Sequence, residues 1–167
     1  GLLLKRGAKL APQLFGGNQQ ENRRPGTESV MLAVGLATAL KISTERMAGQ
    51  REHVRQLRTL FRERLQALAA PVVINSPEDG SPYVLNVAFP GCRGELLLMM
   101  LDLAGIACST GSACSSGSLL PSPVLQAMKV NQHVLDSAMR FSFSASLSEE
   151  NILKATEKIA LSVARSR

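Results

Sequence analysis

The spacing of the hydrophobic residues changes at Pro71, and this change restricts the fold more than any other feature of the sequence. Before the proline, apolar side chains recur every three or four residues, at Val54, Leu57, Phe61, Leu65 and Leu68. This period predicts a long amphipathic helix over residues 44–69. After the proline, short apolar runs at 72–74 and 83–89 predict strands. The chain is therefore expected to pack a long helix against a sheet.

The remaining segments continue this alternation. Ahead of the long helix we expect the end of a strand at 1–5 and a helix that starts at Thr27 or Glu28, with Thr27 as its N-cap. Beyond the strands we expect further helices and short strands at 93–103, 106–108, 121–128, 131–138 and 139–143, and a last helix from Ser148 to about 165. This order predicts an α/β fold, a two-layer small domain with helices on one face of a small mixed sheet, preceded by a helical connecting segment.

Composition excludes several classes of function. At 167 residues, with 45% hydrophobic residues, the chain is long enough to bury a core. No apolar run approaches the roughly 20 residues of a membrane span, so we expect no membrane contact. Much of the net charge of +6 comes from 51–64, where basic residues are interleaved with helically spaced leucines, and from Arg165 and Arg167 at the carboxyl terminus. We interpret these charges as a solvated helix face. With 4% aromatic residues and no recognition motif, we expect no nucleic-acid partner.

The cysteines indicate a reducing compartment. Cys92, Cys108 and Cys114 make an odd number without the spacing of a disulfide scaffold, so we expect a cytoplasmic protein. A zinc site is a poor alternative, because these thiols and the distant His53 and His133 include no paired ligand spacing. We predict no metal site.

Cys114 lies in a run of small residues, CSTGSACSSGS, that spans 108–118. Such a run buries little surface, so we expect an exposed, mobile loop that carries an accessible thiol. Thiolate chemistry requires this access, although most free cysteines are instead buried and inert. Cys108 follows the apolar segment 105–107 and is expected to be a packed structural thiol, and we give Cys92 no role.

Two other segments offer groups that bind anions. Arg140 begins a predicted strand between two apolar residues, and its guanidinium suits a bidentate contact with a carboxylate; a structural ion pair explains it equally well. The glycine-rich segment 16–27 combines backbone freedom, two arginines, the Thr27 hydroxyl and the start of a helix, which together suit a phosphate. An ordinary surface loop remains the alternative for that segment.

Taken together, these motifs resemble a known family. The motifs are GGNQ…RRPGTESV at 16–30, CSTGSACSSGSLLPSPVL at 108–125 and MRFSFSASLSEENI at 139–152, and YVLNVAFPG precedes the second. In order and spacing they resemble the carboxyl-terminal portion of NifS/IscS-type (group I) cysteine desulfurases. The resemblance implies the aspartate-aminotransferase-like fold of enzymes dependent on pyridoxal 5′-phosphate. It also implies a homodimer that converts L-cysteine to L-alanine and carries the sulfur as a persulfide on a loop cysteine.

The resemblance assigns roles to matching residues. Cys114 matches the sulfur-accepting nucleophile, and Arg140 matches the arginine that holds the substrate carboxylate. Thr27 matches the threonine that contacts the cofactor phosphate of the neighbouring subunit, and Arg24 lies near that boundary as a weaker assignment. Many relatives carry serine at the position of Cys108, so we do not make it catalytic.

The family's cofactor lysine has no counterpart here, and we expect it upstream of Gly1. The resemblance thus divides the chain into the tail of a large cofactor domain, 1–43, and a small carboxyl-terminal domain, 44–167. We expect this chain alone to be inactive, and the parent enzyme to pass sulfur to an acceptor or scaffold protein for iron–sulfur cluster or thiocofactor biosynthesis. A selenocysteine lyase and a non-catalytic sulfur-accepting or dimerisation module are the alternatives.

Overall fold

The computed structural model of the chain describes residues 1–110 and 122–167. These residues form two compact units, Gly1–Arg46 and Met47–Arg167. The boundary between the units falls inside helix α2, Val30–Leu68. Cys114 and the predicted loop around it lie outside the described residues. No helix in the described part of the chain is long and apolar enough to cross a membrane.

The first unit contains the glycine-rich segment and the first part of α2. Its one short helical turn, α1, covers Gln19–Asn22, and Gln20 and Glu21 have left-handed backbone angles (φ 51° and 54°). The predicted strand at 1–5 is wrong. A strand requires a neighbour for its backbone groups, and no segment of Gly1–Arg46 pairs with these residues.

Helix α2 replaces the two helices that the sequence predicted at 27–40 and 44–69. The residues between them contain no glycine or proline, so nothing interrupts the backbone hydrogen bonds, and the Thr44 hydroxyl donates to the Leu40 carbonyl at 2.8 Å within the helix. The start predicted for the first of these helices, at Thr27 or Glu28, was also wrong. The helix begins at Val30, and the Ser29 hydroxyl, rather than that of Thr27, accepts the N–H of Leu32 at 3.4 Å.

The second unit is built on a four-stranded sheet with the order β1-β2-β4-β3. The strands are Val73–Ile74 (β1), Val84–Ala88 (β2), Ser109–Thr110 (β3) and Ala138–Ser142 (β4). All pairs of neighbouring strands are antiparallel, so the mixed sheet that we expected is wrong. The helical connection from β2 leads to β3, and these two strands run in the same direction. They are not neighbours, however, because β4 lies between them and runs opposite to both.

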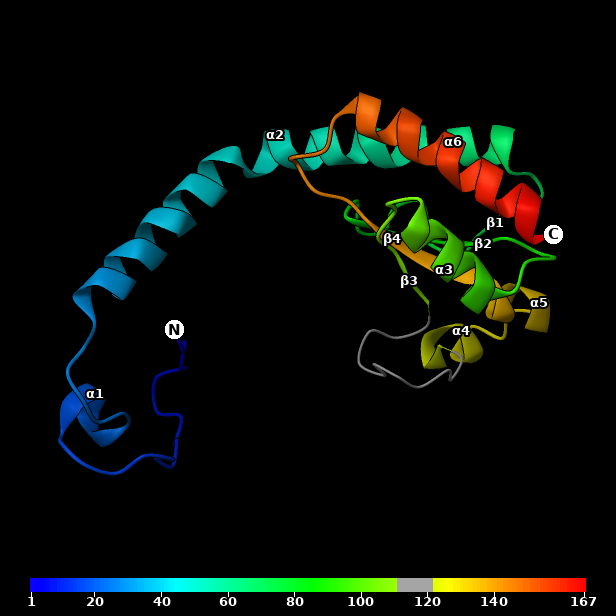
Figure 1. Ribbon diagram of the computed structural model, residues 1–167. Coiled ribbons are helices and arrows are strands. Elements are labelled where there is room, and N and C mark those ends of the chain that lie inside the picture. The colour runs from blue at the N-terminus through cyan, green and yellow to red at the C-terminus, as the bar shows by residue number, and fades with distance from the viewer. Residues whose placement is uncertain (111–121) are drawn as a thin grey trace. The chain divides into compact units, whose positions relative to one another are not determined.

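One face of this sheet carries the main core, and the second half of α2 runs along that face in Figure 1. Alternate strand residues point to this face, among them Leu85, Val87, Met139 and Phe141. They pack against the second half of α2, against α3 (Gly94–Leu103) and against α6 (Glu149–Ser166). The Phe61 ring of α2 lies 5.0 Å from that of Phe141, centroid to centroid. The two-layer prediction is thus correct for the helices that cover this face.

The opposite face has a smaller cover at one end. Leu125 of α4 (Pro123–Ala127) and Val134 of α5 (Gln132–Asp136) pack on Ala88 and Ala138. Because strand residues alternate between faces, the next outward residues after this apolar cover are Asn86 and Arg140. The cover therefore closes one end of the face on which Arg140 lies.

Two arginines anchor the end of α2 to its surroundings. The charged stretch 51–64 was expected to be solvated, but Arg58 is only 5% exposed and donates to the carbonyls of Pro77 and Glu78 at 2.9 and 3.3 Å. Arg167, after α6, donates to the carbonyls of Ala69, Ala70, Pro71 and Pro90 at 2.6–3.3 Å. Because the last carbonyls of a helix lack partners within it, the bond to the Ala69 carbonyl caps the end of α2, and the other bonds hold the segment that follows.

Candidate functional site

Arg140 occupies the middle of a polar row across the sheet. On β4 it lies opposite Asn86 of β2 on one side and Ser109 of β3 on the other. Directly opposed residues of antiparallel strands point to the same face, with Cβ atoms about 4.5–5.5 Å apart. Asn86 and Arg140 are both partly buried, whereas Leu85, Val87, Met139 and Phe141 fill the core on the other face. The guanidinium is therefore carried on a fixed strand away from the core.

Asn86 is held at three points by the segment that follows β1. Its side-chain oxygen accepts the amide of Asn75 at 2.7 Å, and its backbone carbonyl accepts the Asn75 N–H at 2.9 Å. Its own N–H donates to the Ser76 hydroxyl at 2.8 Å. Sequence reasoning missed Asn86, although an asparagine at the middle of the apolar strand 83–89 is the signal that could have revealed it.

Strand β3 links this row to the second sequence motif, which contains Cys114. Ser109 and Thr110 pair with Arg140 and Met139 respectively. Cys114 follows Thr110 by four positions in the sequence. The structure thus places the strand that leads to Cys114 directly beside the strand that carries Arg140, while Cys114 itself lies outside the described residues.

Cys108 has the environment of a structural thiol, as its sequence predicts. It is partly buried and packs against the main core. Burial, with a smaller contribution from the charge of Asp102, raises the pKa of the Cys108 thiol to about 11. Because the thiolate is the reactive form, this thiol is a poor nucleophile at neutral pH. Cys92 is buried in the same core, with its thiol 3.8 Å from the Val163 carbonyl.

Thr27 lies in the first unit and Arg140 in the second. Thr27 is exposed, and Arg24 donates to the carbonyls of Gly26 and Thr27 at 3.2 and 3.4 Å. Gly26 has a φ of 94°, which a residue with a side chain rarely adopts. An exposed hydroxyl beside a guanidinium fits one edge of a phosphate, but these groups alone do not surround one.

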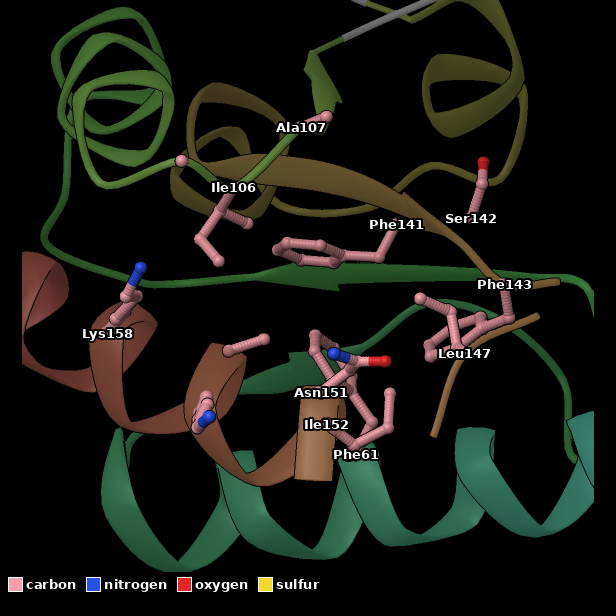
Figure 2. A pocket seen from close by; sticks show the side chains of 13 residues that line it. Phe61, Ile106, Ala107, Phe141, Ser142, Phe143, Leu147, Asn151, Ile152 and Lys158 are labelled. Carbon is pink, nitrogen blue, oxygen red and sulfur yellow. The ribbon is translucent and has the colours of Figure 1, made fainter. Parts of the chain in front are cut away.

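The described residues also form a pocket of about 480 Å³ on the core side of the sheet. Figure 2 shows Phe61, Phe141 and Phe143 around it, with Lys158 of α6 at one side. The Lys158 amine donates to the Ala104 carbonyl at 2.8 Å. The pocket lies on the face opposite to Arg140 and is mostly apolar, so it is not part of the polar row.

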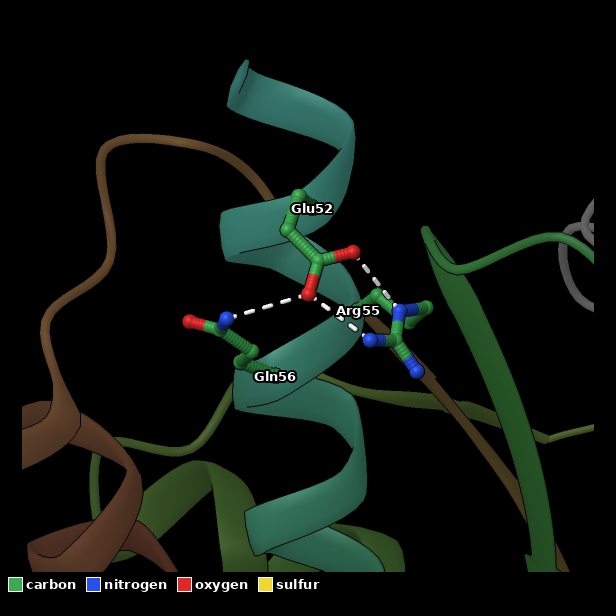
Figure 3. A network of polar contacts seen from close by, with 3 residues as sticks. All are labelled: Glu52, Arg55 and Gln56. Carbon is green, nitrogen blue, oxygen red and sulfur yellow. Dashed lines mark hydrogen bonds and ion pairs between the residues drawn. The ribbon is translucent and has the colours of Figure 1, made fainter. Parts of the chain in front are cut away.

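A polar network on α2 is a surface feature. Arg55 makes two hydrogen bonds to Glu52 at 2.8 and 2.7 Å, and Gln56 adds a third at 3.0 Å (Figure 3). The bonds from Arg55 lower the pKa of the Glu52 carboxyl below its ordinary value. All three side chains are exposed, and such i to i+3 and i to i+4 contacts are typical of solvated helices. We assign them no chemistry.

Comparisons with known proteins agree on the family. The aminotransferase class-V family model matches residues 8–154. The chain is 40% identical over 161 residues to the putative cysteine desulfurase IscS 1 of Bacillus subtilis, covering 95% of this chain and 42% of that protein. It is 35% identical over 167 residues to the cysteine desulfurase NifS of Azotobacter vinelandii, covering 99% of this chain and 42% of that protein.

A solved structure described as a NifS-like protein matches with a TM-score of 0.80 and 29% identity. The match covers 97% of this chain and 41% of the solved one. The chain thus spans about two fifths of the length of the relatives that it matches. Both the sequence and the fold resemble the NifS/IscS type. The chain belongs to the aminotransferase class-V family.

Proposed function

We propose that this chain is the carboxyl-terminal part of a cysteine desulfurase that depends on pyridoxal 5′-phosphate. The observation that carries the proposal is the pairing of Ser109 with Arg140. It sets a carboxylate-binding side chain beside the strand that leads into the cysteine motif. The relatives named cysteine desulfurases support it, since they match this chain over nearly its whole length.

Arg140 binds the α-carboxylate of L-cysteine in this proposal. A guanidinium pairs with both oxygens of a carboxylate through two parallel hydrogen bonds. The β4 backbone is fixed by β2 on one side and β3 on the other. Arg140 therefore projects from a fixed backbone, and only its side chain has to be ordered when the amino acid binds. Arg140 therefore positions the substrate.

Cys114 accepts the sulfur. When bound, the cofactor supplies the electron sink that loosens the bond between Cβ and sulfur. The Cys114 thiolate attacks the substrate sulfur and forms a sulfur–sulfur bond as the Cβ–sulfur bond breaks. The carbon keeps the bonding electron pair and takes up a proton, so that L-alanine and a persulfide on Cys114 result. A loop composed of glycine and serine residues then presents this persulfide to an acceptor or scaffold protein in the cytoplasm.

Thr27 contacts the cofactor phosphate of the neighbouring subunit in a homodimer. Its exposed hydroxyl and the adjacent Arg24 fit one edge of such a phosphate. Residues 1–43 belong to the large cofactor domain and 44–167 to the small domain, with the cofactor lysine supplied upstream of Gly1. Iron–sulfur cluster or thiocofactor biosynthesis is the expected use of the sulfur.

The test compares this chain with the complete polypeptide that the proposal requires. Mixed with L-cysteine and pyridoxal 5′-phosphate, the complete protein is expected to release alanine and, with a thiol reductant, sulfide. The 167-residue chain is expected to give neither product nor the absorbance of a lysine-bound cofactor. Strong turnover by the chain alone would contradict the proposal.

Matched variants and substrates separate the alternatives. C114S should abolish sulfide release, whereas C108S should keep it. Faster turnover of L-selenocysteine, unaffected by C114S, would identify a selenocysteine lyase instead. If the complete protein has no turnover but Cys114 takes sulfur from an active donor desulfurase, the chain is a sulfur-accepting module. Dimerisation without either reaction would assign it a structural role.

A further inference from the structure

The orientation of the Asn86 amide shows a second donor beside Arg140. Strand β2 has β1 on one side and β4 on the other. Asn75, directly after β1, donates to the Asn86 side-chain oxygen at 2.7 Å, so that oxygen faces the β1 side. The two arms of a carboxamide diverge from the same carbon. The Asn86 nitrogen is therefore directed away from β1, and the strand on the other side of β2 is β4, where Arg140 lies opposite Asn86.

Two groups that only donate hydrogen bonds are carried by these directly opposed residues. The Asn86 nitrogen carries two N–H donors, and the Arg140 guanidinium carries five and accepts none. They cannot bond to each other, and because both residues are only partly buried, an acceptor from outside the chain can reach them. A carboxylate is such an acceptor, because its two oxygens offer about four lone-pair directions and a bidentate arginine uses only two of them.

We infer that Asn86 is a substrate-binding residue whose side-chain N–H donates to the same carboxylate that Arg140 holds. The inference deepens the proposed function and rests on it for the identity of the substrate. The Asn75 bond fixes which arm of the amide faces Arg140, and the Ser76 hydroxyl holds the Asn86 backbone at 2.8 Å. Asn75 is thus a positioning residue that acts through Asn86.

The sharpest variant is N86D. Aspartate has the size of asparagine and keeps an oxygen to accept the Asn75 bond, but it replaces the donor with a negatively charged acceptor opposite Arg140. N86L removes the donor without adding charge. S142A is the matched control, because Ser142 lies two residues from Arg140 on the same face and is exposed. Circular dichroism and thermal melting show whether each variant folds.

Kinetics of the complete protein give the first readout. The carboxylate keeps its charge throughout the reaction, so its contacts bind ground and transition states equally and act on KM rather than kcat. A hydrogen bond to a charged group corresponds to a factor of about 10 to 100 in affinity. N86D and N86L are expected to raise KM for L-cysteine at least tenfold with kcat changed less than threefold, and S142A to change neither. N86D with an unchanged KM would overturn the inference.

Nuclear magnetic resonance of the cofactor-free 167-residue chain gives a readout without turnover. Sodium acetate replaces sodium chloride at constant ionic strength, and the side-chain N–H signals of Asn86 and Arg140 are followed. Both should move together in the original chain, and N75A should reduce the movement of the Asn86 signal. Movement of the Arg140 signal alone would overturn the role of Asn86 and leave that of Arg140 intact. Movement of both signals with no turnover in the complete protein would overturn the desulfurase proposal alone.

Discussion

Ser109 on β3 and Arg140 on β4 lie opposite each other in an antiparallel pair. Their pairing joins two motifs that are about thirty residues apart in the sequence and brings the start of the cysteine motif to the strand that carries the guanidinium. The row continues to Asn86 on the other side of Arg140. One sheet thus holds the residues that we propose bind the substrate carboxylate, and Cys114, the proposed sulfur acceptor, follows the edge strand β3 in the sequence.

Arg140 is expected to determine the affinity for the carboxylate. R140K keeps the charge but loses the planar fork that binds both oxygens. In the complete protein it should raise KM for L-cysteine by about tenfold, and R140A by about 100-fold or more. Cysteamine, which lacks the carboxylate, should inhibit the original protein and both variants equally. A KM for R140A within twofold of the original would contradict the assignment.

The Cys108 thiol is expected to resist alkylation at neutral pH. Its pKa is raised to about 11 because burial and Asp102 disfavour the thiolate. The fraction of thiolate, and hence the rate with iodoacetamide, should rise as the pH increases from 8 towards 11. Because the folded pKa exceeds the unfolded value, the contribution of this thiol to stability is complete below about pH 9 and is lost as the pH rises through 11. Peptide mass spectrometry measures the rate, and rapid labelling of Cys108 at pH 7 would disprove the assignment.

The buried Arg58 is expected to stabilise the fold more than its exposed neighbour Arg62. R58M leaves the carbonyls of Pro77 and Glu78 without their donor and should lower the free energy of unfolding by about 1–3 kcal/mol. Arg62 pairs with the exposed side chain of Glu78 at 3.3 Å, and R62M should cost less than about 1 kcal/mol. Urea unfolding compares the two. Equal effects would show that burial of Arg58 contributes nothing.

Arg167 is expected to hold the end of α2 in place. R167A removes hydrogen bonds to the carbonyls of Ala69, Ala70, Pro71 and Pro90. Because Arg167 is exposed and water can replace part of these bonds, the substitution should destabilise the chain by only about 1–2 kcal/mol. R165A is the control, because Arg165 is exposed on the same helix. Hydrogen exchange should rise at the last turn of α2 in R167A only. Unchanged exchange there would contradict the cap.

The sequence predicts most elements of the second unit because their patterns are local, but the strand expected at 106–108 is wrong, since β3 is formed by Ser109–Thr110. Ser148 caps α6, and the reciprocal bond between Asn151 and the Ser148 N–H completes a capping box. What the sequence could not predict depends on contacts between distant segments. The insertion of β4 between β2 and β3 made the sheet fully antiparallel. The role of Arg58 depends on two carbonyls about twenty residues away.

The candidate site also contains one residue that the local sequence predicts and one that depends on contacts between distant segments. Arg140 was predicted from its type and motif, and the register then gave it neighbours. Asn86 was missed because its significance comes from the opposite strand, not from its own surroundings in the sequence. The roles of Arg140, Cys114 and Thr27 stay predictions.

The most direct test of the central claim is to locate the sulfur. The complete protein is incubated briefly with L-cysteine labelled with heavy sulfur, trapped with an alkylating agent and digested for mass spectrometry. We predict one labelled sulfur atom added to the thiol of Cys114, and none on Cys92 or Cys108. Labelled sulfur on Cys108, or alanine formed without any sulfur on Cys114, would contradict the account.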